Sequence, residues 1–282
     1  MGSYCILTDT SAQFTKPAFA GRDLVRVIPL SMCLNGKVVE NDNFRVSSLP
    51  IVADDKLKPH LIAPGVEEFQ KMFTALTQNF DDIIVLLISS QLNEAFSNAE
   101  KAIELISGSS RVHLIDSLTL SAGLGMLTQQ AVESASLQFP ANEIEQHVRK
   151  LIPRVYSYFC TPSLSYLYHS GFIDQAQATV GEMLGLYPLY TLEEGKLSPV
   201  EKVKNFRTAM EYFQEFLDEF DSLDHIALIQ GGAQTSQETK LIRLYGEENF
   251  PGVSISEHPL NPSLATLFGP RFWGLTVMES AA

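Results

Sequence analysis

Hydrophobic and polar positions in the first half of the chain alternate between short apolar runs and stretches with helical spacing. The runs Tyr4–Thr8 and Arg111–Ile115 predict strands, and Ile83–Ile88 is apolar on both faces, as in a central parallel strand. Val25–Met32 predicts a further strand at a sheet edge, because Pro29 cannot donate a ladder hydrogen bond. Strands that alternate with helices indicate a mostly parallel α/β sheet.

Helical spacing fills the segments between these strands. One apolar stripe per helix is predicted, at Phe69, Met72, Phe73 and Leu76 in the first helix and at Phe96, Ala99, Ile103 and Ile106 in the second. Longer helical patterns cover residues 118–138 and 142–152. We therefore predict an N-terminal parallel-sheet α/β domain over residues 1–152.

The second half is richer in isolated strands and in glycine and proline. Strands are predicted at 155–160, 226–229, 253–256 and 272–278, and a helix at 201–220. This mixture predicts a smaller C-terminal α+β domain over residues 153–282.

Polar residues follow three of the strands predicted in the first half. They are Asp9-Thr10-Ser11, Ser89-Ser90 and Asp116-Ser117. The carboxyl ends of parallel strands share one edge of a sheet, where ligands bind in such folds, so we expect these groups to converge. Two interpretations of the serines stay open. Their oxygens, with that of Asn93, cap the following helix, or that helix start holds an anionic headgroup through its free N–H groups.

Charge and composition exclude several classes of protein. Acidic residues number 33 against 20 basic ones, giving a net charge of -13, so nucleic acid and anionic membranes are not expected partners. No apolar stretch approaches the ~20 residues that span a bilayer, which predicts no membrane insertion. The first residues lack a basic region followed by an apolar core, so we expect a cytoplasmic protein.

No established catalytic motif is present in the sequence. HExxH, GxSxG, GxGxxG and the P-loop are all absent, which predicts a protein that is not an enzyme and uses no cofactor. The six histidines are scattered and the three cysteines lie in apolar surroundings, so we expect no metal site and buried free thiols. A hydrolase built on Ser117, or on Ser90, is a third hypothesis, which reaction with a serine-directed probe would test.

Short motifs in both halves of the chain resemble those of the DegV family of bacterial fatty-acid-binding proteins, in the same order and spacing. They are Leu7-Thr8-Asp9-Thr10-Ser11-Ala12, Val27-Ile28-Pro29-Leu30, Pro64-Gly65-Val66-Glu67-Glu68-Phe69, Ile88-Ser89-Ser90-Gln91-Leu92, Ile115-Asp116-Ser117, Ser165-Tyr166-Leu167, Gly195-Lys196-Leu197 and Gly269-Pro270. The resemblance implies two α/β domains with a long-chain fatty acid in a tunnel between them. It also implies a role as the lipid-presenting subunit of a fatty acid kinase.

The resemblance also implies where the fatty acid headgroup is held, and this chain departs from the family at each position. Leu61 stands at the family's threonine with Ile62 beside it, and Asn93 stands at its serine. Phe172 replaces an arginine and Leu267 a histidine. Only Asn93 keeps a side-chain hydrogen-bond donor, so the headgroup site is less polar than in the family.

Two hypotheses for the headgroup follow. Either Asn93, Ser89 or Ser90 holds it together with backbone N–H groups, or the ligand is less charged or sits elsewhere, with Arg271 as an available cation. We predict a carrier that binds a long-chain fatty acid or related acyl lipid. The alternative is a ligand-free interaction or regulatory protein whose tunnel is filled by Leu61, Phe172 and Leu267.

Overall fold

The computed structural model describes residues 2–39, 44–231 and 237–281. The chain forms two compact units. Unit 1 comprises Met1–Leu30, Ile62–Pro153 and Glu194–Lys196, and unit 2 comprises Ser31–Leu61, Arg154–Glu193 and Leu197–Ala282. Residues 31–61 thus fold with the second half of the chain, which makes unit 2 the larger of the two units.

Unit 1 is built on a four-stranded parallel sheet in the order β2-β1-β6-β7. Its strands are β1 (Tyr4–Asp9), β2 (Val25–Ile28), β6 (Asp82–Leu87) and β7 (Val112–Asp116). All six residues of β1 are buried, and five of the six in β6. The predicted parallel sheet and the central position of the apolar run at 83–88 are confirmed.

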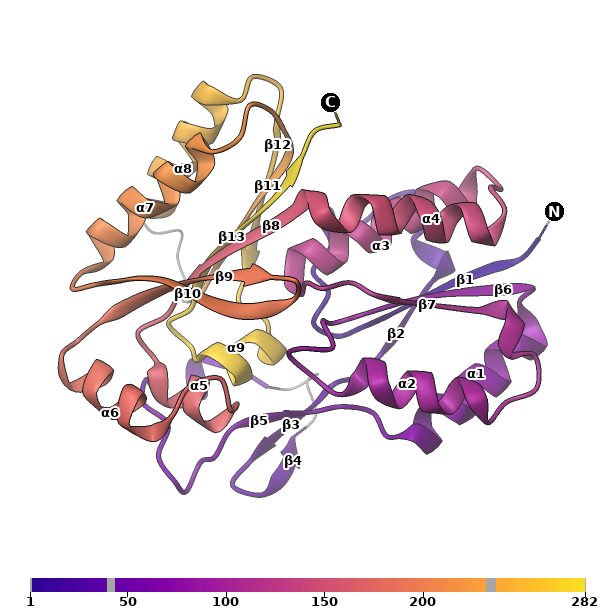
Figure 1. Cartoon of the computed structure of the whole chain (residues 1–282), viewed down its shortest axis with the longest axis horizontal. Helices are drawn as coiled ribbons and strands as arrows, with labels where there is room; N and C mark the ends of the chain where they lie inside the picture. Colours follow the sequence, from indigo (N-terminus) through magenta and orange to yellow (C-terminus); the bar gives the residue numbers. More distant parts are fainter. Residues whose placement is uncertain (1, 40–43, 232–236, 282) are drawn as a thin grey trace. The chain divides into compact units, whose positions relative to one another are not determined.

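Two helices cover each face of this sheet (Figure 1). One face carries α1 (Val66–Asn79) and α2 (Ala95–Glu104), and the other carries α3 (Ser121–Ser136) and α4 (Ala141–Leu151). In α1 the residues Phe69, Phe73 and Leu76 are buried, as predicted. In α2 the predicted Ala99 is buried, together with Ala95 and Ala102. The other members of the predicted stripe, Phe96, Ile103 and Ile106, are half-buried.

The predicted single strand at Val25–Met32 is two strands in two different sheets. β2 ends at Ile28 and is the edge of the unit 1 sheet. β3 (Ser31–Leu34) lies in unit 2, in a three-stranded sheet with β4 (Lys37–Val39) and β5 (His60–Ile62). Pro29 explains the break, since it has no N–H group with which to continue the β2 ladder.

Unit 2 contains a mixed six-stranded sheet in the order β10-β9-β8-β13-β11-β12. The strands are β8 (Val155–Cys160), β9 (Tyr187–Glu193), β10 (Lys196–Val203), β11 (Leu223–Gln230), β12 (Ser254–Pro259) and β13 (Trp273–Glu279). β12 pairs with β11 in parallel, whereas β13 pairs with both β11 and β8 in antiparallel orientation. All four strands predicted in this half are confirmed, and β9 and β10 are additional.

The helices of unit 2 are α5 (Leu164–His169), α6 (Gln175–Met183), α7 (Phe206–Asp218), α8 (Gln237–Asn249) and α9 (Pro262–Phe268). The predicted helix over 201–220 begins too early, because Glu201–Val203 are the end of β10. Asn205 marks the true start, since its side chain accepts a hydrogen bond from the Thr208 N–H at 2.8 Å. Short 3₁₀ turns occur at Arg22–Leu24, Val46–Ser48, Ser109–Arg111 and Ile152–Arg154.

Aromatic residues fill both sides of the large sheet in unit 2, following the alternation of side chains along β8. On the α7 side, Tyr158 stacks on Phe216 with ring centroids 4.9 Å apart. The next residue, Phe159, instead contacts Phe268 and Phe272, at 5.7 and 5.2 Å. Burial raises the pKa of Tyr158 to about 12. The sheet therefore has an apolar layer on each face.

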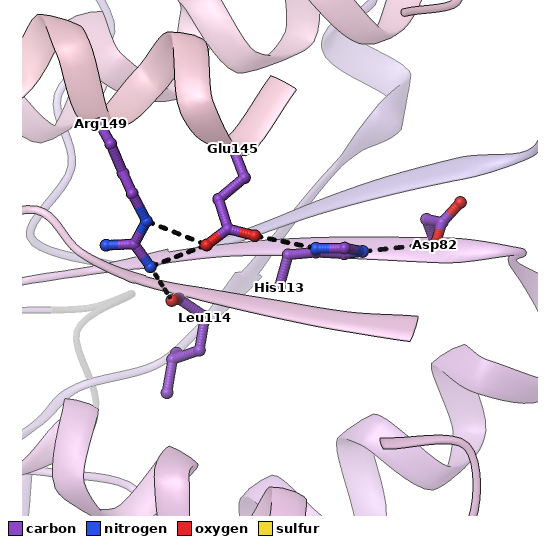
Figure 2. A network of polar contacts seen from close by, with 5 residues as sticks. All are labelled: Asp82, His113, Leu114, Glu145 and Arg149. Carbon is purple, nitrogen blue, oxygen red and sulfur yellow. Dashed lines mark hydrogen bonds and ion pairs between the residues drawn. The ribbon is translucent and has the colours of Figure 1, made fainter. Parts of the chain in front are cut away.

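A polar network ties α4 to the sheet of unit 1 (Figure 2). The His113 ring lies between Glu145 on α4, at 3.0 Å, and Asp82 at the start of β6, at 3.4 Å. Arg149 binds the second oxygen of Glu145 at 2.9 Å and donates to the Leu114 carbonyl at 3.0 Å. Burial alone raises the pKa of Glu145, but its bonds to His113 and Arg149 outweigh this and lower the pKa overall.

Candidate functional site

The carboxyl ends of β1, β6 and β7 converge in unit 1, as the sequence predicts. Asp9 is fully buried there and joins two strand ends, because one carboxylate oxygen accepts the Ile88 N–H at 2.6 Å. The other oxygen accepts the N–H and hydroxyl of Ser11, at 2.8 and 2.6 Å. Burial raises the pKa of Asp9, and these three hydrogen bonds oppose the rise. Asp9 is therefore a structural junction.

The serines and Asp116 are also engaged within unit 1. The Ser90 N–H donates to Asp116 at 3.1 Å, and the Ser117 hydroxyl donates to the Leu87 carbonyl at 2.6 Å. Ser89 is fully buried, and its hydroxyl donates to the Gly195 carbonyl at 2.8 Å. A Cβ on Gly195 would lie 2.3 Å from that hydroxyl, so only glycine fits there. The structure brings the predicted polar groups together, but their hydrogen bonds fix the loops that follow the strands.

The helix cap expected from the serine and asparagine oxygens is formed by Asn93 and not by the serines. Glu94 precedes the first residue of α2 and makes no side-chain cap. Asn93 supplies the oxygen instead, accepting the Ala95 N–H at 3.0 Å. The hydroxyl of Ser89 reaches only the N–H of Gln91, at 3.2 Å, in the turn that precedes the helix. The Asn93 side chain therefore caps α2, whether or not it also contacts a ligand.

The remaining predicted site residues are divided between the units. Ile62 lies in unit 1, whereas Leu61, Phe172, Leu267 and Arg271 lie in unit 2. Leu61 and Ile62 end the short strand β5 and are half-buried. Leu267 is buried in α9 with 3% of its surface exposed. The role of each in holding a headgroup stays a prediction.

Phe172 lines a largely apolar cavity of unit 2. This cavity has a volume of about 490 Å³ and lies entirely within unit 2, between α5, α6, β9 and β10. Its apolar lining comprises Leu164, Phe172, Ile173, Ala176, Val180, Gly181, Leu186, Pro188, Tyr190, Leu197 and Pro199. The ring of Phe172 stacks on Phe268 at 6.1 Å and forms part of the wall, leaving the cavity open. We call it the α6 cavity.

Two polar side chains border the α6 cavity, Gln177 on α6 and Lys202 on β10. Neither was predicted from the sequence as a site residue. Gln177 is the third residue of α6 and forms a capping box with Asp174. The Asp174-x-x-Gln177 pattern was a usable sequence signal for the helix start. No sequence signal marks Lys202, because its place at the cavity depends on the packing of β10.

Arg271 lines a second cavity of unit 2, of about 350 Å³, together with Tyr187, Phe206 and Trp273. Tyr187 borders this cavity, while its neighbour Pro188 borders the α6 cavity. Because successive residues of a strand point to opposite faces, the two cavities lie on opposite sides of β9. Arg271 therefore does not border the apolar cavity.

The three cysteines are buried free thiols, as predicted. Burial raises the pKa of Cys5 to about 11 and that of Cys160 to about 12, so neither thiol is a ready nucleophile. Across the described part of the chain, no three His, Cys, Asp or Glu side chains gather where they could hold a metal ion. Within that same part, no helix has the length and apolar character needed to cross a membrane.

Solved structures of similar fold share a common description. A fatty acid binding DegV family protein from Streptococcus agalactiae matches the whole chain with a TM-score of 0.84 and 20% identity, over 100% of both chains. DegV, a fatty acid binding protein from Bacillus subtilis, matches with a TM-score of 0.80 and 19% identity, over 99% of this chain and 100% of its own. These likenesses establish the two-domain α/β fold.

Sequence comparisons assign the family. A DegV domain-containing protein from Listeria monocytogenes is 29% identical over 272 residues, which is 89% of this chain and 90% of the relative. The family model described as an uncharacterised protein of the DegV family matches residues 3–280. The resemblance seen in the short motifs is thus confirmed over nearly the full length, and the chain belongs to the DegV family.

Proposed function

We propose that this protein binds one long-chain fatty acid or related acyl lipid, with the acyl chain in the α6 cavity. The observation that carries the proposal is the apolar lining of that cavity, at a volume of about 490 Å³. Small-molecule sites fall at about 300–1,000 Å³ and are mostly apolar with a few placed polar groups. The fatty acid binding described for the similar structures supports the same ligand class.

The proposal extends to a carrier that presents its lipid to a partner enzyme such as a fatty acid kinase. Two features support binding without catalysis. The buried carboxylate Asp9 is occupied by three hydrogen bonds, and the Ser117 hydroxyl donates to a backbone carbonyl. Neither group is arranged as a nucleophile with an adjacent base.

The ligand-free alternative predicts that bulky side chains fill the site. Phe172 lies in the wall of an open cavity, and Leu267 is buried in α9 outside that lining. Both observations favour a protein that still has room for an acyl chain.

The test has two stages. Native mass spectrometry of the purified protein, followed by organic extraction, would identify a bound lipid and its chain. The delipidated protein is then titrated with saturated fatty acids of increasing length. If the chain is buried, affinity rises about fourfold per methylene, from ~0.8 kcal/mol per buried CH₂, until the cavity is full. Affinity that does not change with chain length, or no uptake at all, would favour the interaction-protein alternative.

A further inference from the structure

The rim of the α6 cavity carries one charged residue among the described ones, Lys202. We propose that the anionic headgroup of the ligand lies at this rim, between the ammonium of Lys202 and the side-chain amide of Gln177, with the acyl chain directed inward. This inference rests on the proposed function, since it names the headgroup position for the same cavity. It differs from the headgroup positions expected at Asn93, Ser89, Ser90 and Arg271.

Lys202, on β10, is part of the lining of the α6 cavity. The next residue, Val203, is 7% exposed and belongs to the core on the α7 side of the sheet. Lys202, the residue before it, instead borders the α6 cavity, as do Leu197 and Pro199 of the same strand. The carboxylate of Glu201 accepts the backbone N–H of Lys202 at 2.7 Å. Among the described residues, no carboxylate forms an ion pair with the Lys202 ammonium.

Gln177 supplies a second donor that the helix start holds in place. Its side-chain oxygen accepts the Asp174 N–H at 3.1 Å, and its own N–H donates to the Asp174 carboxylate at 2.7 Å. With the amide oxygen engaged in this capping box, the NH₂ group of the same amide is the part left to donate to a ligand. An oriented amide donor beside an ammonium suits a carboxylate, which accepts hydrogen bonds only.

Solvent exposure favours the headgroup at this rim over a buried position. Gln177 and Lys202 are both exposed, so a carboxylate between them keeps part of its hydration. At the fully buried Ser89 it would be desolvated, and the hydroxyl there already donates to Gly195. A carboxylate at the rim also stays within reach of a partner enzyme while the chain remains bound. The ion pair is exposed, so its contribution is modest.

The experiment compares oleate with oleyl alcohol, which has the same chain and no charge, in calorimetric titrations of the delipidated protein. For Lys202→Met we expect oleate affinity to fall three- to fivefold and oleyl alcohol affinity to stay unchanged, the size typical of an exposed ion pair. Added salt should weaken oleate binding to the wild type and not to the variant. Lys204→Met, two residues along and outside the cavity lining, is the charge-matched control and should change neither affinity.

Gln177→Glu gives an independent check that preserves the fold. Its carboxylate still accepts the Asp174 N–H, but it replaces the amide donor with a negative charge. Oleate affinity should fall and oleyl alcohol affinity should not. An equal loss for both ligands, or a loss for neither in both variants, would overturn the headgroup assignment while leaving the acyl site intact. Wild-type protein that takes up neither ligand would overturn the proposed function itself.

Discussion

Polar side chains are arranged differently at the strand ends of unit 1 and at the α6 cavity of unit 2. In unit 1, Asp9, Ser89 and Ser117 are buried, and each has hydrogen-bond partners within the unit. In unit 2 the cavity wall is mostly apolar, and the side chains of Gln177 and Lys202 lie exposed at the rim.

The difference separates a structural polar cluster from a binding site. A buried polar group must be satisfied when no ligand is present, so the unit 1 cluster is stable because it is complete. An apolar cavity loses only dispersion contacts when empty, and it regains them when an acyl chain enters. Polar residues at strand ends are therefore a weaker guide to the ligand in this protein than an apolar space with few polar groups.

The largest expected effect concerns the structural polar cluster of unit 1. Asp9→Ala removes the acceptor of three hydrogen bonds and leaves buried donors of Ser11 and Ile88 unsatisfied, so unit 1 should lose about 2–4 kcal/mol of unfolding free energy. Asp9→Asn keeps one acceptor oxygen and should lose less. Trp273, the single tryptophan, lies in unit 2, so urea unfolding followed by circular dichroism and by tryptophan fluorescence compares the two units. An unchanged circular dichroism transition would contradict this role for Asp9.

The binding side is tested by filling the cavity. Ala176 borders the α6 cavity from α6, and Ala176→Trp should reduce affinity for oleate tenfold or more, about the loss of two buried methylenes. Thr179→Trp is the matched control, because Thr179 is exposed on the same helix and is not part of the lining. Calorimetric titration of both variants measures the effect. Equal affinities in the two variants would remove the acyl chain from this cavity.

Asn93 distinguishes a cap from a headgroup ligand. Asn93→Ala should cost about 1 kcal/mol of stability, because the Ala95 N–H loses its acceptor. Asn93→Asp keeps that acceptor but lacks the amide donor, so with the headgroup at Lys202 its oleate affinity should change less than about twofold, well under 1 kcal/mol. Titration of Asn93→Asp with oleate decides between the two headgroup positions, since a large loss of affinity would place the headgroup at the start of α2.

The smallest effect concerns the network of Figure 2 and its pH dependence. The pKa of Glu145 is lowered from 4.5, so its contribution to stability is complete above that value and is lost as pH falls through the folded-state pKa. Glu145→Gln should therefore flatten the decline in stability below pH 4.5. Glu143→Gln, on the same helix, is the control. Urea titrations at several pH values make the comparison, and parallel curves for wild type and Glu145→Gln would refute it.

Much of the fold could be predicted because it depends on local pattern. The apolar run at 83–88 predicted the centre of a parallel sheet, and Phe69, Phe73 and Leu76 predicted the buried face of α1. Errors arose where tertiary context decided the outcome. The strand predicted at Val25–Met32 divides between two sheets, and the fully buried side chains of α2 are alanines, whereas its larger apolar side chains are only half-buried.

The candidate site also divides into features that the sequence predicts and features that only the structure shows. Sequence alone determined the family resemblance, the parallel sheet and the convergence of Asp9, Ser89 and Ser117 at its edge, because strand direction and period fix where strand ends fall. Only the tertiary structure showed that each of these groups already has a hydrogen-bond partner, since partners distant in sequence cannot be read from a linear pattern. It also decided that Phe172 and Lys202 border one cavity, because the shape of an apolar space depends on how α6 packs against β9 and β10.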